Sequence, residues 1–151
     1  MISIFELFKI GVGPSSSHTV GPMLAAQQFA RSLQSTAKQP RSVRVVLFGS
    51  LALTGLGHRS DRAVIAGLFG EHPRTVEPSR LDELYDQVTS TRSLKLGGVL
   101  EVPFDLSTDL VLDGSRFLPE HPNGMKFVVE FVDDSSDEQT YFSVGGGFIA
   151  N

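Results

Sequence analysis

The chain has 151 residues, of which 40% are hydrophobic and 20% are charged, values that are ordinary for one soluble globular domain. A formal net charge of −4 argues against a nucleic-acid surface, and no apolar run is long enough to span a membrane. The absence of cysteine excludes disulfides, thiol nucleophiles, thiolate zinc sites and iron–sulfur ligation by this chain. Residues 1–10 lack a signal-peptide pattern, and the absence of cysteine fits the cytoplasmic location that we expect.

The first half of the chain predicts two helices and one strand. Apolar residues at steps of three and four predict an amphipathic helix over residues 19–36. Residues 42–48 are rich in β-branched side chains, which favours a buried strand, and residues 49–57 are expected to form a turn or a short helix. Residues 61–69 are apolar nearly all round, as in a buried helix with Asp61 at its N-cap or in its first turn.

The second half of the chain predicts mostly strands. A more polar helix over residues 78–91 is followed by short strands at residues 99–104, 109–112, 125–132 and 139–144. The last two strands are expected to pair as a hairpin across a solvated acidic loop, residues 133–138. This order predicts an α/β (α+β) two-layer sandwich, with helices packed on one mixed or antiparallel sheet of about four strands. We expect residues 1–151 to form a single domain.

A stretch rich in glycine and hydroxyl groups, residues 11–22, directly precedes and enters the first predicted helix. A helix N-terminus offers unpaired N–H donors and the positive end of a dipole, so it suits a carboxylate or phosphate ligand. The alternative is a hydroxyl-rich helix cap, because serine and threonine are common caps. The stretch matches neither the hydrolase elbow nor the phosphate-loop or dinucleotide motifs.

Any imidazole chemistry must use His18, His58, His72 or His121. His58 lies in a loop that directly precedes a predicted buried helix, where it is a candidate general base; the alternative is a histidine bonded to a neighbouring carbonyl. His121 lies beside an Asn-Gly turn signal, for which a plain β-turn is the alternative. His72 is expected in a surface loop without a role. No pair of histidines has the spacing of a helical metal site, so we expect no metal in this chain.

Taken together, several stretches resemble the N-terminal β domain of the iron–sulfur-dependent bacterial L-serine dehydratases (L-serine deaminases). The resemblance covers essentially the whole chain, and its most specific part is Gly13-Pro14-Ser15-Ser16-Ser17-His18-Thr19. The other matching stretches are residues 4–12, 20–23, 49–55, 57–63, 121–125 and 143–148. The resemblance implies a fold similar to the anion-binding domain of some phosphoglycerate dehydrogenases.

The resemblance implies that the catalytic [4Fe–4S] cluster is held by cysteines of a separate α domain, and that this chain binds no cofactor itself. We therefore interpret the chain as a fragment that is inactive without the α domain. The expected partners are that α domain, L-serine and a second copy in a homodimeric enzyme, with no nucleic acid and no membrane.

The resemblance also implies roles for individual residues. His58 is the candidate base that takes the Cα proton of L-serine, Asp61 is the candidate residue that orients it, and His18 and His121 are secondary candidates for proton transfer or substrate binding. The residues expected to hydrogen-bond the substrate are Ser15, Ser16, Ser17, Thr19 and Asn123. The alternative is an allosteric module that senses L-serine or another small anion and supplies no catalytic group. A weaker alternative is a scaffold that only holds subunits together.

One position departs from the family pattern. The family usually has Gly-His-Gly-Thr-Asp where this chain has Gly57-His58-Arg59-Ser60-Asp61. Serine in place of threonine keeps a hydroxyl group. Arginine in place of glycine costs about 1 kcal/mol if that position needs a positive φ. It also places a cation beside His58, which favours the neutral, basic form of the imidazole.

Overall fold

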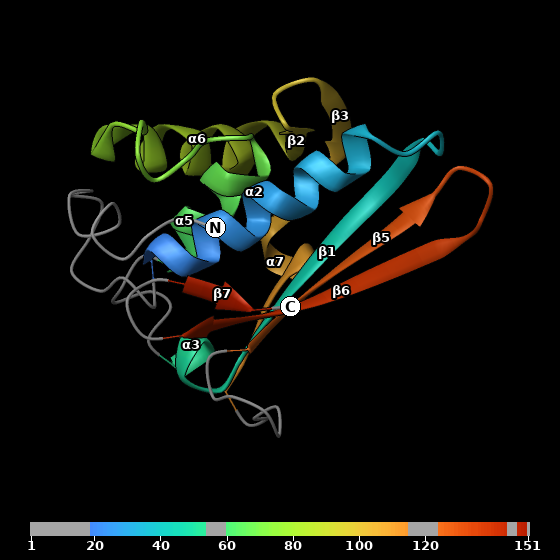
Figure 1. The fold of residues 1–151 in the computed structure, drawn as a ribbon. Coiled ribbons are helices and arrows are strands. Elements are labelled where there is room, and N and C mark those ends of the chain that lie inside the picture. Colours follow the sequence, from blue (N-terminus) through green and yellow to red (C-terminus); the bar gives the residue numbers. More distant parts are fainter. Residues whose placement is uncertain (1–18, 54–59, 115–123, 145–147, 151) are drawn as a thin grey trace.

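The structure is a computed structural model that describes residues 19–53, 60–114, 124–144 and 148–150. Helices and strands are interspersed along these ranges (Figure 1). The helices are α2 (Gly21–Gln34), α3 (Gly49–Leu53), α5 (Ser60–Leu68), α6 (Pro78–Thr91) and α7 (Leu106–Asp109). The strands are β1 (Pro40–Phe48), β2 (Ser93–Leu96), β3 (Leu100–Pro103), β4 (Leu110–Asp113), β5 (Gly124–Phe131), β6 (Ser136–Val144) and β7 (Phe148–Ala150).

The described strands form two sheets. The main sheet has the order β4-β1-β5-β6-β7, and β2 and β3 form a separate two-stranded sheet. Strand β1 runs parallel to β4, whereas the pairs β1–β5, β5–β6 and β6–β7 are antiparallel. The main sheet is therefore mixed, and helices pack on it, so the predicted α/β fold is confirmed. Short strand β7 is its fifth strand, where about four were expected.

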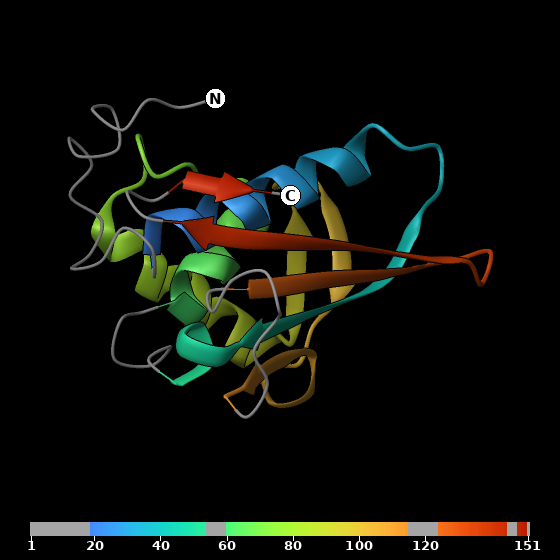
Figure 2. The same cartoon turned by 60° about the horizontal axis from the view of Figure 1, so that its bottom comes forward.

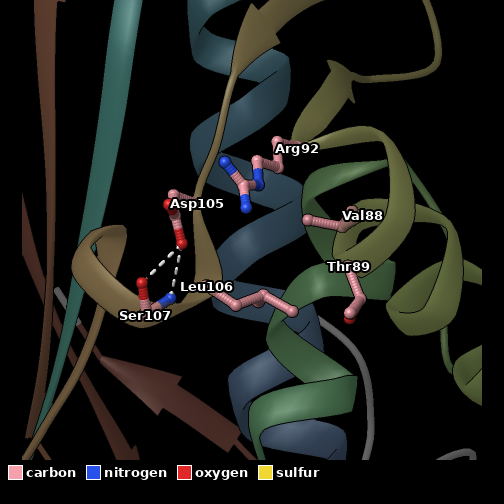
Figure 3. A pocket seen from close by; sticks show the side chains of 6 residues that line it. All are labelled: Val88, Thr89, Arg92, Asp105, Leu106 and Ser107. Atoms are coloured by element: carbon pink, nitrogen blue, oxygen red, sulfur yellow. Dashed lines mark hydrogen bonds between the residues drawn. The ribbon is translucent and has the colours of Figure 1, made fainter.

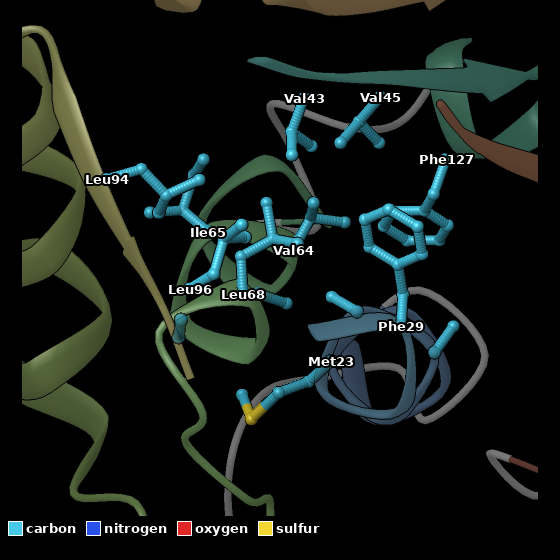
Figure 4. Packing of buried hydrophobic residues seen from close by; sticks show 14 of the residues in the cluster. Met23, Phe29, Val43, Val45, Val64, Ile65, Leu68, Leu94, Leu96 and Phe127 are labelled. Carbon is cyan, nitrogen blue, oxygen red and sulfur yellow. The ribbon is translucent and has the colours of Figure 1, made fainter. Parts of the chain in front are cut away.

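The core lies between the main sheet and helices α2 and α5 (Figures 1 and 4). Strand β1 was predicted as a buried strand, and its first part instead alternates, because Val43 and Val45 are buried while Arg44 between them is exposed. From β5, the ring of Phe127 stacks on the ring of Phe29 in α2, with 5.0 Å between their centroids. These contacts fix α2 against the middle of the sheet.

The helices agree closely with the sequence-based prediction. Helix α6 has the predicted bounds, and α2 begins at Gly21 with a proline in its first turn. Helix α5 begins at Ser60, which places Asp61 in the first turn rather than at the N-cap. Within the described ranges, each helix is too short or too polar to cross a lipid bilayer.

The predicted acidic loop over residues 133–138 was wrong in its second half. Ser136 already pairs with Glu130, so β6 begins there and the turn is confined to residues 132–135. Asp137 and Glu138 remain solvent-exposed within the strand, so their charges do not oppose pairing with β5. The short elements β2, α7 and β7 have no counterpart among the predicted elements.

Candidate functional site

Several ends of the main-sheet strands meet at one end of the sheet. Leu47 pairs with Met125 and Phe48 pairs with Asp113, so β1 and β4 finish where β5 begins. Strand β6 also finishes there, because it runs antiparallel to β5 and Phe142 pairs with the first residue of β5. We call this the motif end, defined by the last residues of β1, β4 and β6 and the first residue of β5.

Each predicted site motif is followed in the sequence by a described residue that lies at or beside the motif end. Figures 1 and 2 show the beginnings of α2 and α5 on the same side of the molecule as α3, which follows β1 directly. The junctions are Thr19, which follows His18; Ser60, two residues after His58; and Gly124, which follows Asn123. The sheet order therefore brings together junctions that are far apart in the sequence.

Three polar or charged side chains are fully buried among the described residues, namely Thr19, Ser60 and Asp61. Their exposed fractions are 0%, 0% and 1%. Burial of a polar group, and above all of a carboxylate, costs free energy unless the group has partners. All three residues lie within three positions of a histidine that the sequence marks as a site candidate. Buried polarity is thus concentrated beside the predicted motifs.

The Asp61 carboxylate is bound through both of its oxygens. Its Oδ1 accepts a hydrogen bond from the backbone N–H of Arg62 at 2.8 Å, and its Oδ2 lies 3.3 Å from the Nη1 of Arg62. The Arg62 Nε also bonds the Oδ1 of Asp82 in α6 at 2.8 Å. The Arg62 guanidinium carbon lies 4.4 Å from the centroid of the Tyr85 ring. Asp61 is therefore held from α6 as well as from its own helix.

The Tyr85 hydroxyl responds to this environment. Burial is the largest cause that raises the pKa of Tyr85, and the negative charge of Asp61 raises it further. The positive charge of Arg62 opposes this shift. The Tyr85 hydroxyl therefore stays protonated near pH 7, and the neutral ring contacts the Arg62 guanidinium.

Two of the predicted site residues, Thr19 and Asp61, lie within the described residues, and both are buried beside the motif end. The N-cap position of α2 is occupied by Val20, which forms no side-chain capping bond. The other predicted site residues lie outside the described residues, and so does Arg59. They are His18, His58, His121, Ser15, Ser16, Ser17 and Asn123.

Arg62, Asp82 and Tyr85 were not among the predicted site residues. Arg62 follows Asp61 directly and lies in the matching stretch of residues 57–63, and these sequence signals pointed to it. Asp82 and Tyr85 are three residues apart on α6, so they share a helix face, but that spacing is common on solvated helices. Their contact with Arg62 depends on how α6 packs against α5, which the sequence does not state.

His72 lies in the loop between α5 and α6, as predicted, and is half-buried. Its Nδ1 accepts a hydrogen bond from the backbone N–H of Arg74 at 3.0 Å. Burial, followed by the charges of Arg74 and Arg31, lowers the pKa of His72. These contacts are local, and they assign His72 no part in the candidate site.

A cavity of about 290 Å³ lies between α6 and α7 (Figure 3). The Asp105 carboxylate accepts hydrogen bonds there from the backbone N–H of Ser107 at 2.9 Å and from its hydroxyl at 2.6 Å. These bonds lower the pKa of Asp105. The cavity lining is Val88, Thr89, Arg92, Asp105, Leu106 and Ser107, which includes none of the predicted site residues.

The chain offers no cysteine ligand for an iron–sulfur cluster. It contains no cysteine, and no group of three or more histidine, aspartate or glutamate side chains in its described part could hold a metal ion. A thiolate-bound cluster needs four cysteine ligands in its common forms. The residues present therefore do not fit such a cluster.

Residues 3–151 match the model of a protein family described as serine dehydratase beta chain. The chain belongs to this family. The beta chain is 44% identical to L-serine dehydratase of Streptomyces coelicolor over 99% of its length, and 42% identical to that of Helicobacter pylori over 97%. It is also 42% identical to L-serine dehydratase 2 of Escherichia coli over its full length.

The beta chain spans about a third of the length of these relatives, namely 34%, 32% and 34%. About two thirds of each relative's sequence lies outside the matched region. The comparison therefore assigns this chain to the beta-chain family.

Proposed function

We propose that this chain is the β domain of an L-serine dehydratase, and that it supplies histidine and hydroxyl groups to an active site shared with a catalytic α domain. The observation that carries the proposal is the coincidence of buried Thr19, Ser60 and Asp61 with the junctions of the predicted motifs. The relatives named L-serine dehydratase, at 41–44% identity, support the choice of reaction.

Chain connectivity supports a shared site at the motif end. Successive Cα atoms are about 3.8 Å apart, so a residue two positions from an anchored residue stays within about 8 Å of it. His18 is one position from Thr19 and His58 is two positions from Ser60, so this limit applies to both. His121 is three positions from Gly124, at the start of β5, so its limit is wider.

Dehydration of L-serine breaks its Cα–H and Cβ–O bonds and releases water. The resulting enamine tautomerises to an imine, and hydrolysis of the imine gives pyruvate and ammonia. In our proposal the neutral imidazole of His58 takes the Cα proton, and the Asp61 carboxylate orients that imidazole. Ser15, Ser16, Ser17, Thr19 and Asn123 bind the carboxylate or hydroxyl of the substrate. His18 and His121 assist proton transfer or binding.

Departure of the substrate hydroxyl is assigned to the α domain. This chain cannot hold the [4Fe–4S] cluster that we expect in the family, since it has no cysteine. We also propose that the complete enzyme is a cytoplasmic homodimer. That assembly rests on the resemblance, and light scattering of the complete enzyme tests it.

A second candidate function is an allosteric module that senses L-serine or another small anion. One observation favours it. Thr19, Ser60 and Asp61 are buried by this chain alone, so the domain encloses them without a partner. In this role the His58 motif would bind an effector rather than a reacting substrate.

Kinetics of the complete enzyme, with this chain joined to its α domain and assayed without oxygen, test the proposal. We expect L-serine to give pyruvate and ammonia in equal amounts, with D-serine as a stereochemical control. An Asp61→Asn enzyme should retain the cluster absorbance but lose most of its kcat. A complete enzyme that is inactive on L-serine, or an Asp61→Asn enzyme with normal kcat, would contradict the proposed role. A sensor would instead keep kcat at saturating L-serine and change the serine dependence.

A further inference from the structure

Arg62 joins a buried carboxylate at the start of α5 to the side of α6. Its contacts with α6 include the Arg62 Nε–Asp82 Oδ1 bond at 2.8 Å and a cation–π contact, in which the guanidinium carbon lies 4.4 Å from the centroid of the Tyr85 ring. The Arg62 side chain is 29% exposed, whereas Asp82 is 56% exposed. The network therefore runs from the solvent-facing side of α6 inward to Asp61.

Two contacts of the Asp61 carboxylate depend on the position of Arg62. One carboxylate oxygen bonds the Arg62 backbone, and the other faces the Arg62 guanidinium. The guanidinium is a planar fork, so its position is restricted once its Nε is bonded and its carbon lies over an aromatic ring. Asp82 and Tyr85 provide these two constraints. Together they limit how the Asp61 carboxylate can turn.

An exposed ion pair does not explain this arrangement. Pairs between solvated side chains contribute little and need no fixed geometry. Asp61 is 1% exposed, and removal of the Arg62 guanidinium would leave its buried charge without that ionic partner. By contrast, Arg80 of α6 bonds Glu71 and Glu83 at 3.5 and 3.3 Å among more exposed side chains. Arg80 therefore provides a matched control.

We propose that Arg62 is a positioning residue, which α6 clamps through Asp82 and Tyr85 so that it fixes the carboxylate of Asp61 for the reaction. The inference rests on the proposed function, in which Asp61 orients the catalytic histidine. It adds to that function a helix, α6, whose residues carry none of the motifs that led to the family. Helix α6 then acts as a support for the site rather than as a plain outer layer.

A double-mutant cycle in the complete enzyme tests the proposal. Arg62→Met should lower kcat for L-serine about tenfold or more, while KM changes less than about threefold. The same substitution in an Asp61→Asn background should lower kcat hardly at all, because Arg62 acts through Asp61. Arg80→Met should leave kcat and KM near the wild-type values. Equal losses from Arg62→Met in both backgrounds would overturn the proposal.

Tyr85→Leu is a second variant in case Arg62→Met fails to fold, since it removes the aromatic support and the hydroxyl that bonds Asp61 but keeps the Arg62 side chain that pairs with Asp61. We expect a smaller loss of kcat, which again disappears in the Asp61→Asn background. Arg62→Lys should rescue part of the activity of Arg62→Met, because it restores the charge without the fork. Full activity of Tyr85→Leu together with full rescue by lysine would contradict a clamp.

The results also separate this inference from the proposed function. If Asp61→Asn retains normal kcat, the role of Asp61 itself fails. If Asp61→Asn loses activity and Arg62→Met does not, the role of Asp61 stands and the positioning role of Arg62 fails.

Discussion

Gly67 of α5 lies directly against the backbone carbonyl of Met23 in α2. A Cβ atom built on Gly67 would overlap that oxygen and would lie 2.7 Å from the Cβ of Ala26. Only glycine lets the two helices approach this closely. Because α2 follows the His18 motif and α5 follows the His58 motif, this contact sets the relative position of the two helices that carry them.

Gly67→Ala should therefore separate α5 from α2. We expect a loss of about 1–3 kcal/mol in the free energy of unfolding, as for other overpacked cores. In the complete enzyme, kcat for L-serine should fall by more than the smaller fraction of folded protein accounts for. Urea unfolding and steady-state kinetics measure the two effects. Gln28→Ala, on the exposed side of α2, is the control that should change neither.

Helix α6 ends at a residue in a conformation that favours glycine. Arg92 has φ 53° and ψ 38°, and its N–H donates to the carbonyl of Val88 at 2.8 Å. A side chain in this left-handed region costs about 1 kcal/mol. Arg92→Gly should keep the bond and raise the free energy of unfolding by about 0.5–1 kcal/mol. Arg92→Ala removes the charge but keeps the Cβ, so thermal unfolding of this variant should show no such gain.

The agreement between sequence and structure is uneven, for physical reasons. Helix α6 was predictable because its apolar residues recur at helical spacing over a long segment, and a proline marks its start. Strands β2 and β7 have four and three residues, which is too short for a clear period. The start of β6 was missed because Asp137 and Glu138 suit a loop by composition, while their pairing with β5 decides their structure.

The residues of the candidate site could be proposed from the sequence, but their relative positions could not be predicted from it. The histidines and hydroxyl groups were visible in the sequence. The meeting of the described residues that adjoin their motifs depends on the strand order, in which β1 lies between β4 and β5. The support from Arg62 and Tyr85 depends on how α5 packs on α6. No local pattern in the chain encodes either relationship.

His72 should make the stability of the protein depend on pH in mildly acidic solution. Its folded-state pKa is lowered, chiefly by burial, so below about pH 6.5 the unfolded chain binds a proton more readily than the folded one. The contribution of neutral His72 to the free energy of unfolding is fully present above about pH 6.5, and it is lost as the pH falls through the folded-state pKa of His72. Protonation also removes the acceptor that bonds the N–H of Arg74.

Urea unfolding of wild type and His72→Gln at about pH 7.5 and pH 5.5 tests this expectation. Glutamine cannot titrate, so the variant should lose less stability between the two pH values than the wild type does. Equal losses in the two proteins would show that other groups account for the acid dependence.

The most direct test of the account is the kcat of the complete enzyme with His58→Ala, measured at saturating L-serine beside a His72→Ala control. We predict a fall of about 10²–10⁴-fold for His58→Ala, as for loss of a general base, with an intact cluster absorbance and near-normal kcat for His72→Ala. A His58→Ala enzyme that reaches wild-type kcat at saturation would contradict the shared active site, and a changed serine dependence would then assign this domain to sensing.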